Sequence, residues 1–480
     1  MIFASNLFCF YFLPFFMVLY LVTPLKYRNW TALIGSGLFY AWGAPGFVFV
    51  LMASAAVDFY LARALYQAPT KKANRLLILG IAYNLGLLLY FKYANFFVDN
   101  FNALLDELGY VGVEWTKVAL PLGISFFTFQ KLSYLIDVRR SARPPLDKGH
   151  EYALYVVLFP QLVAGPIVRF KQVADQIRDR RHQENIDFRL SGLFRFAIGL
   201  GRKVLIANPL AREVDKIFAL PEDQLTTMLA WLGPFAFSIV IFHDFAGYSD
   251  MALGLGRMMG FKLPENFRNP YISASITEFW QRWHLTLTDW FRSYLFYPLR
   301  RIAVRRWILY LNLWIVFLLA GLWHGAAWTF IVFGVWHGTW LTLERVFLLK
   351  WLNRLPKLVS VPWTFFIFLL GTVFFKAADM DVAWRIIGKM FAFDFVVNAA
   401  FYEDFGLALG NKFAFLLLLG SFFSFYALIP GVEKWQTRTA ELQTGNWSSI
   451  GWAGLAALLL VLSVSELGTM GFSPFIYYMF

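Results

Sequence analysis

The chain has 480 residues, of which 59% are hydrophobic, 20% aromatic and only 15% charged. This composition excludes a water-soluble globular domain and indicates an all-α membrane protein, since a helix needs about 20 apolar residues to cross a bilayer. The formal net charge is +13, but the basic residues lie in short segments between apolar runs. We therefore expect these segments to face the cytoplasm and to bind no nucleic acid. The single cysteine excludes an internal disulfide and a cysteine-based metal cluster.

Apolar runs follow one another along the whole chain. The first, at about 7–24, has no basic segment before it and no small-residue cleavage site after it, so we interpret it as a membrane helix. Further runs occupy about 30–66, 76–98, 118–136, 192–207, 225–260, 306–349, 361–377, 412–430 and 449–466. Together they predict about eleven to fourteen membrane-embedded helices, some of them short or interrupted. Because no internal repeat and no soluble region stand out, we predict a single membrane domain over residues 1–480.

One apolar run, EYALYVVLFPQLVAGPIVRF at 151–170, contains Pro160, Gly165 and Pro166. Proline removes a backbone donor and interrupts a helix. Irregular backbone at membrane depth is tolerated only where protein or water satisfies its polar groups. This segment is therefore predicted to be a broken or re-entrant element that lines a cavity.

The segment TEFWQRWHLTLTDWFRSYLFYPLRR at 277–301 has a different pattern. Its large apolar residues recur every three or four positions, at Trp283, Leu287, Trp290 and Tyr294. A polar stripe with the same spacing runs beside them, at Arg282, Thr286, Asp289 and Ser293. The pattern predicts one aromatic-faced helix at the cytoplasmic interface. Such a helix is either a structural anchor or, because His284 lies beside Arg282, part of a functional cavity.

Two Trp-His-Gly triplets place His324 and His337 in the apolar run FLLAGLWHGAAWTFIVFGVWHGTW. Ionisable groups within membrane helices are functional candidates by default, although a packed structural histidine is the plain alternative. On one continuous helix the two imidazoles would lie roughly 140° apart and about 20 Å along the axis. They cannot then act on one substrate atom unless the chain breaks between them. One is expected to do chemistry and the other to be structural, and spacing alone does not choose between them.

The stretch FHDFAGYSDMALG at 242–254 places Asp244, Tyr248 and Asp250 near His243 in apolar surroundings. No second histidine or glutamate follows at the spacing of a zinc site, so we predict no metal. Helix pairing or pore lining is the favoured interpretation. The chain also has no phosphate-binding loop with its lysine and no Gly-x-Ser-x-Gly nucleophile elbow.

Seven motifs in chain order resemble the membrane-bound O-acyltransferase (MBOAT) family. They are FYAWG, YFKYANFF, LPLGISFFTFQKLSYLIDV, FPQLVAGPIVRF, DFAGYSDMALGLG, PENFRNPYISASITEFWQRWHLTL and LAGLWHGAAWTFIVFGVWHG. Within the family, the chain is most similar to the bacterial branch of the alginate O-acetylation and teichoic-acid D-alanylation membrane proteins. The resemblance covers residues 1 to about 350, with a family-like core at about 118–350. It implies a helical fold with re-entrant and interfacial helices around a central tunnel.

The resemblance also assigns candidate site residues. His324, in GLWHGA, matches the family's catalytic histidine, and His284, in EFWQRWH, matches its second functional polar position. No catalytic role carries over to His337. The tunnel-lining or structural polar candidates are Arg282, Asp244, Tyr248, Asp250, Arg169, Gln130 and His337.

The same resemblance implies acetyl-CoA as the acyl donor, bound from the cytoplasm, and no bound cofactor. The acyl group would cross the bacterial inner membrane to an extracytoplasmic SGNH-type acyltransferase that esterifies a cell-surface polysaccharide. The tail GFSPFIYYMF at 471–480 resembles the acyl-accepting tail of this branch. Tyr477 is therefore a candidate acyl carrier, with His324 as its general base, since a phenol with a pKa near 10 needs such help. A purely aromatic membrane anchor is the alternative for this tail.

Some positions depart from the family pattern. Ser293 stands where the family often has Asp, Arg300 and Arg301 where it often has glycines, and His243 where the alginate type usually has an aromatic residue. Alginate, cellulose, peptidoglycan and other surface glycans therefore stay open as acceptors. The alternatives in function are a transporter or channel, and an MBOAT enzyme that transfers D-alanine or modifies lipids or proteins. A transporter is expected to show repeat-related halves, which the sequence lacks.

Overall fold

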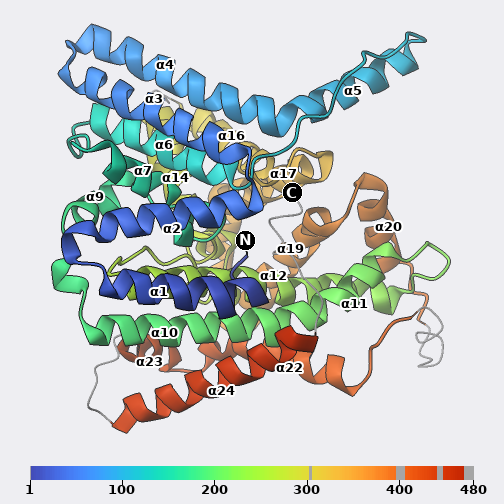
Figure 1. Ribbon diagram of the computed structural model, residues 1–480. Coiled ribbons are helices and arrows are strands. Elements are labelled where there is room, and N and C mark those ends of the chain that lie inside the picture. The colour runs from blue at the N-terminus through green and yellow to red at the C-terminus, as the bar shows by residue number, and fades with distance from the viewer. Residues whose placement is uncertain (1, 302–304, 396–405, 440–446, 470–480) are drawn as a thin grey trace. The chain divides into compact units, whose positions relative to one another are not determined.

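The computed structural model describes residues 2–301, 305–395, 406–439 and 447–469 (Figure 1). Within these ranges the chain consists of helices joined by loops and turns, with no strand. The all-α prediction is thereby confirmed. Tyr477 and the tail at 471–480 lie outside the described residues, so the predicted acyl carrier stays a prediction.

Seven helices in the described ranges are long and apolar enough to cross a membrane. They are α3 (Phe47–Gln67), the continuous helix Thr70–Glu107, α12 (Thr227–Met258), Trp307–His324 of α16 (Arg306–His324), α19 (Lys357–Lys376), Asn411–Leu428 and Ile450–Gly468 of α24 (Trp447–Thr469). The chain is therefore a multi-pass membrane protein. Other predicted apolar runs form shorter helices, such as α6 (Ile124–Arg139) and α17 (Trp328–Leu343).

The contacts divide the chain into two compact units. The first comprises 1–192 with 255–264, and the second comprises 193–254 with 265–480. The single-domain prediction is not tested by this division and stays a prediction.

The first unit contains α1 (Leu13–Val22), α2 (Arg28–Gly43) and α3, followed by α4 (Thr70–Leu88), which continues into α5 (Ala94–Glu107). Figure 1 shows α5 extending beyond the neighbouring helices of this unit. After it come α6, α7 (Gly149–Val157), α8 (Phe159–Leu162) and α9 (Phe170–Arg178). The predicted break in 151–170 is confirmed, because α8 is a single turn and an irregular segment follows it with Gly165 at φ +98°.

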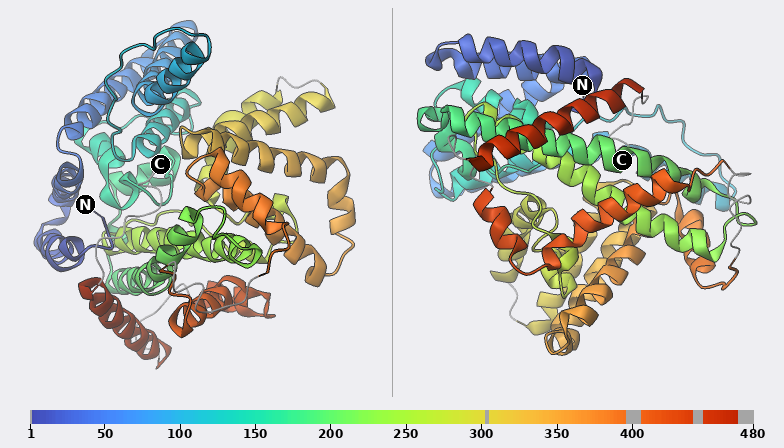
Figure 2. Two further views of the ribbon diagram at one scale, coloured as in Figure 1. Left: turned by 90° about the vertical axis from the view of Figure 1, so that its right-hand side faces the viewer. Right: turned by 90° about the horizontal axis from the view of Figure 1, so that it is seen from below.

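The second unit is built around α12, which packs closely on α10 (Ile186–Gly201). A methyl group added at Gly247 of α12 would lie 2.7 Å from the carbonyl oxygen of Gly199, so both positions need glycine for the two backbones to meet. After α10 the chain forms the π-helix η5 (Arg202–Ala207) and α11 (Asn208–Ala219). Leu459 of α24, the long red helix in Figure 2, packs against Gly201 at the start of this π-helix.

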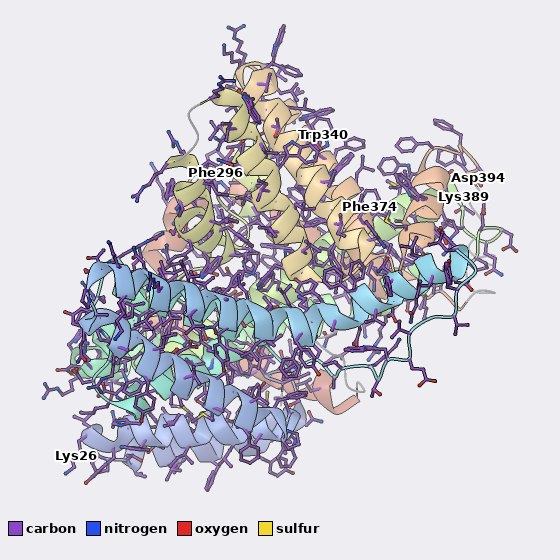
Figure 3. All side chains as sticks on the ribbon, turned by 90° about the horizontal axis from the view of Figure 1, so that it is seen from above. Lys26, Phe296, Trp340, Phe374, Lys389 and Asp394 are labelled. Carbon is purple, nitrogen blue, oxygen red and sulfur yellow. The ribbon has the colours of Figure 1, made fainter. Side chains whose placement is uncertain are left out.

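The start of α12 is tied to the end of α20 (Met380–Met390). Asp394 accepts a hydrogen bond from the backbone N–H of Thr227 at 2.8 Å and pairs with Lys389 at 3.3 Å (Figure 3). The rest of this unit comprises α13 (Ile276–Phe279), α14 (Leu285–Phe291), α15 (Tyr297–Arg301), α16, α17, α19, α22 (Asn411–Phe425), α23 (Val432–Thr439) and α24.

The prediction of one continuous helix over 277–301 is wrong. The chain forms α13, a turn at 280–284, α14, a π-helix at Arg292–Phe296 and α15. The helix stops because His284 adopts a left-handed conformation with φ +44°. Trp283 therefore lies outside the helix that carries Leu287, while Leu287, Trp290 and Tyr294 are buried as their spacing predicts.

Candidate active site

A hairpin of two helices positions His324. α16 ends at His324, the backbone is extended at Gly325 and Ala327, and α17 begins at Trp328. The chain thus breaks between the two Trp-His-Gly triplets, which is the condition under which His324 and His337 can approach each other.

Glycines bring the two helices of this hairpin together. A methyl group at Gly321 would lie 2.3 Å from the carbonyl oxygen of Phe330, and one at Gly334 would lie 2.5 Å from that of Phe317. Small residues at the contact between two helices are typical of close helix packing in membranes. Gly321, one turn before His324, therefore serves the approach of a second helix backbone.

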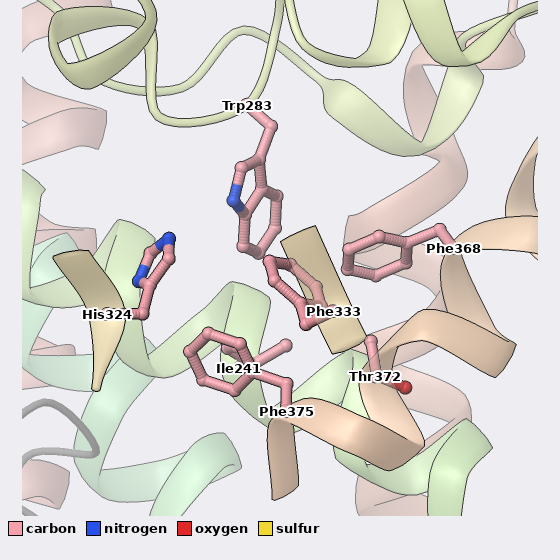
Figure 4. A pocket seen from close by; sticks show the side chains of 7 residues that line it. All are labelled: Ile241, Trp283, His324, Phe333, Phe368, Thr372 and Phe375. Carbon is pink, nitrogen blue, oxygen red and sulfur yellow. The ribbon is translucent and has the colours of Figure 1, made fainter. Parts of the chain in front are cut away.

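His324 is buried in aromatic surroundings. Its ring centroid lies 5.1 Å from that of Trp323, 5.2 Å from Phe375 and 5.9 Å from Phe333. The imidazole also lines a cavity of about 10 Å³, close to the minimum that one water molecule needs. The other lining residues, shown in Figure 4, are Ile241, Trp283, Phe333, Phe368, Thr372 and Phe375. His324 is thus a titratable side chain at the wall of an otherwise mostly apolar cavity.

His284 lies at the N-terminus of α14 and is fully buried. Its Nδ1 accepts a hydrogen bond from the backbone N–H of Leu287 at 3.3 Å, so the neutral ring carries its proton on Nε2. Burial lowers the pKa of His284 to about 3, which keeps the ring neutral at physiological pH. Within the described part of the chain, Nε2 has no hydrogen-bond partner. His284 is therefore a buried, neutral imidazole with an N–H that no acceptor among the described residues satisfies.

The structure brings His284 and His324 to the same indole ring. The centroid of Trp323 lies 5.8 Å from that of His284 and 5.1 Å from that of His324. His337 lies against Phe333 at 4.7 Å, and Phe333 also contacts His324. Neither nitrogen of His337 has a hydrogen-bond partner among the described residues, and Trp280 packs edge-on against the ring at 5.1 Å. His337 is thus a packed core histidine that does not line the cavity.

A buried asparagine that the sequence did not single out holds the His284 turn. Asn266 accepts a hydrogen bond from the hydroxyl of Thr286 at 2.9 Å and donates one to Ser249 of α12 at 3.1 Å. Its backbone carbonyl also accepts from Leu285 N–H at 2.9 Å. The sequence signal was present, since Asn266 lies inside the family motif PENFRNPY.

Glu344 is a second buried residue that sequence reasoning missed. Its carboxylate accepts hydrogen bonds from the backbone N–H groups of Ile276 and Thr277 at 2.6 and 2.8 Å, and from the Thr277 hydroxyl at 2.7 Å. Glu344 therefore caps α13, the short helix that leads into the His284 turn. A single carboxylate in the apolar stretch LTLERVFLL was the available signal.

The acidic candidates of α12 form ion pairs away from the cavity lining. Asp244 pairs with buried Lys203, and Asp250 pairs with Arg195 at 2.9 Å and Arg202 at 2.7 Å. Tyr248 is fully buried between them along the helix. These contacts agree with the helix-pairing interpretation of this motif. Among the described residues, no group of three histidine, cysteine or acidic side chains is placed to hold a metal ion.

His243, next to Asp244, holds the C-terminal part of the unit. Its Nε2 lies 2.9 Å from the carbonyl oxygen of Gly420 and 3.2 Å from the hydroxyl of Ser424, both on α22.

Three further candidates do not line the cavity. Arg282 bonds Glu278 at 2.9 Å and Glu433 at 2.7 Å. Gln130 and Arg169 belong to the first unit, where Gln130 is buried in α6 and Arg169 precedes α9. Their role in a tunnel stays a prediction.

The model of the family described as "MBOAT, membrane-bound O-acyltransferase family" matches residues 124–374, which is more than half of the chain. The chain belongs to this family. His284, His324 and His337 all lie inside the matched range. This MBOAT chain is therefore an acyltransferase embedded in the membrane.

Similar proteins carry more specific names. The MBOAT chain is 39% identical to "Probable alginate O-acetylase AlgI" of Pseudomonas putida over 492 residues, which cover 100% of both chains. It is 35% identical to the peptidoglycan O-acetyltransferase of Helicobacter pylori over 81% of this chain and 80% of that protein. It is 30% identical to the teichoic acid D-alanyltransferase of Bacillus subtilis over 51% of this chain and 63% of that protein.

Proposed function

We propose that this enzyme transfers an acetyl group from cytoplasmic acetyl-CoA toward the outside of the bacterial inner membrane, for O-acetylation of a cell-surface polysaccharide. An extracytoplasmic SGNH-type acyltransferase is the expected partner. The names of two relatives that match over four fifths or more of both chains support an acetyl group and a polysaccharide acceptor. The observation that carries the proposal is the convergence of His284 and His324 on Trp323, with His324 at the wall of the cavity.

The two histidines suit complementary roles in acyl transfer. His324 acts as general base and removes the proton of an acceptor hydroxyl while its oxygen attacks the thioester carbonyl of acetyl-CoA. The C–O bond forms, the C–S bond breaks, and His324 returns the proton to the departing sulfur. Positioned proton transfer of this kind contributes about 10² to 10⁴ in rate.

His284 then stabilises the charge that develops on the carbonyl oxygen. Its Nε2–H is a neutral donor in a water-excluded site, where one such hydrogen bond is worth roughly 10² to 10³ in rate. The hydrogen bond from the backbone N–H of Leu287 to Nδ1 keeps the proton on Nε2. The acceptor hydroxyl is proposed to be that of Tyr477, or one supplied by the partner.

The test is acetyl transfer by the purified full-length enzyme in lipid vesicles, with radiolabelled acetyl-CoA and the isolated partner. His324→Ala is expected to lose at least about 10² of the rate, with normal membrane insertion and yield. His337→Leu, in the second Trp-His-Gly triplet, is the matched control and is expected to retain the rate. Unchanged transfer by His324→Ala removes the proposed base, while label that crosses the vesicle as intact acetyl-CoA indicates a transporter.

A further inference from the structure

The His284 turn is a strained structure that its surroundings must hold. Among the described residues, only four non-glycine residues have positive φ, and two of them, Asn269 and His284, lie in the segment 266–286. A non-glycine residue in a sparsely populated backbone region costs on the order of 1–3 kcal/mol and persists only where neighbouring contacts impose it. The contacts of this segment therefore decide where the His284 ring points.

Backbone hydrogen bonds join the two limbs of the segment, which are residues 266–269 and 282–285. Arg268 N–H donates to the carbonyl of Arg282 at 2.9 Å, and Leu285 N–H donates to the carbonyl of Asn266 at 2.9 Å. These bonds lie on either side of His284 in the chain. A displacement of Arg282 or Arg268 is therefore transmitted directly to the backbone of His284.

One face of the amphipathic helix α23 bonds both limbs. Glu433 accepts a hydrogen bond from Arg282 Nη1 at 2.7 Å and one from Asn269 Nδ2 at 3.3 Å. Gln436, three residues later and therefore on the same face, accepts from Asn269 Nδ2 at 2.7 Å. Arg282 and Glu433 are 151 residues apart in sequence, and Asn269 and Gln436 are 167 apart. Only tertiary structure therefore brings α23 to the turn.

The Arg282–Glu433 pair is well placed to hold this geometry. The Arg282 side chain is 19% exposed and Glu433 is 41% exposed, so the pair is partly shielded and accessible to substitution without opening the core. Arg282 also donates to Glu278 and to the carbonyl of Arg268, which fixes its guanidinium in one orientation. The planar guanidinium thus joins α23, α13 and both limbs of the turn.

We propose that Glu433 is a positioning residue for acyl transfer, which acts through Arg282 and Asn269 to hold His284 in its strained conformation. This inference rests on the proposed role of His284 as a hydrogen-bond donor. It extends the active site to a helix outside the range matched by the family model. α23 supplies no group to the reacting atoms; it fixes the direction of the His284 N–H.

The test compares kcat and KM for acetyl-CoA in Glu433→Ala, Glu433→Gln and the charge exchange Arg282→Glu/Glu433→Arg. Glu433→Ala is expected to lower kcat about tenfold with KM unchanged. A misplacement of about 1 Å costs roughly 10²-fold, and the bonds that Gln436 and Glu278 keep to Asn269 and Arg282 limit the displacement to less than that. Glu433→Gln keeps an acceptor for Asn269 and is expected to lose less, and the charge exchange is expected to recover part of kcat relative to Arg282→Glu alone. Lys412→Ala breaks the exposed pair between Lys412 and Glu466 at 3.4 Å and is the matched control.

A double substitution separates positioning from general stability. In a His284→Gln background, Glu433→Ala is expected to cause no further loss of kcat, because the residue that it positions is already absent. An equal loss in both backgrounds, or an unchanged kcat in Glu433→Ala, overturns the positioning role. If His284→Gln alone keeps the full rate, it is the proposed function of His284 that fails, and the two failures are therefore distinguishable.

Discussion

The glycine contact between α16 and α17 allows a quantitative prediction at Gly321, one turn before His324. In Gly321→Ala the new methyl carbon would lie 2.3 Å from the carbonyl oxygen of Phe330. Carbon–oxygen contacts in proteins lie at about 3.3–3.6 Å, so the two backbones must separate by about 1 Å. The atom that must yield belongs to a helix backbone, and the adjustment therefore moves the whole end of α16.

This separation is expected to affect both stability and rate. Overpacking lowers the free energy of unfolding by about 1–3 kcal/mol. The higher helix propensity of alanine offsets about 1 kcal/mol of this loss. A shift of about 1 Å at His324 lowers the acyl-transfer rate by roughly 10²-fold. The rate effect is thus expected to exceed what the small loss of folded protein explains.

Gly338→Ala is the matched control in the same hairpin. Its methyl group would lie 3.4 Å from the nearest heavy atom, the side-chain Cβ of Phe317, which is ordinary contact. Thermal unfolding and acetyl transfer in vesicles are measured for both variants. A Gly321→Ala enzyme with wild-type rate and unfolding temperature would refute close packing as the reason for the glycines. An equal loss of rate and stability in both variants would point to helix flexibility instead.

Three further substitutions test other parts of the site. Glu344→Gln leaves one N–H of the α13 terminus without its acceptor, so the free energy of unfolding is expected to fall by about 1–3 kcal/mol and the transfer rate to fall with it. Glu222→Gln, at an exposed glutamate, is the control and is expected to change neither. His337→Leu removes two buried nitrogens that have no hydrogen-bond partner among the described residues. The free energy of unfolding is therefore expected to stay within about 1–2 kcal/mol of wild type, and the transfer rate within about twofold. A loss of transfer would make His337 functional. Asp244→Asn leaves the buried charge of Lys203 without its counter-charge, so the free energy of unfolding is expected to fall by about 3–5 kcal/mol. The double variant Lys203→Met/Asp244→Leu is expected to regain most of this stability. A double variant that stays unstable or inactive would show a role of the pair beyond packing.

Local pattern was sufficient for much of the fold. Apolar runs of membrane length predicted the long helices, and Pro160 and Gly165 predicted the break after α7, because both effects depend only on neighbouring residues. The motifs around His284 and His324 predicted two of the residues that meet at Trp323. Their catalytic roles stay predictions.

The errors share one physical cause, which is that tertiary contacts overrule local periodicity. The spacing of Trp283, Leu287 and Trp290 continues across a helix break that contacts to Asn266 and Glu344 impose. The sequence marks both residues as unusual, through a family motif and an apolar context, but it does not say which backbone groups they bind. The partner of Arg282 on α23 is likewise defined only by folding.

The small residues around His324 show the same limit. Glycine leaves space, but the sequence does not say whether a substrate or a helix fills it. In the structure the backbone of α17 takes the space beside Gly321, and the ring of Phe330 takes the space beside Gly325.

The aromatic packing around His324 bears on the permeability of the membrane. A continuous file of water through a protein embedded in a membrane would conduct protons down their electrochemical gradient. The rings of Trp283, Phe333 and Phe375 leave a cavity of about 10 Å³, which holds about one water molecule and not the continuous file that proton conduction requires. The rings that pack around His324 thus leave no room for a water file beside the imidazole.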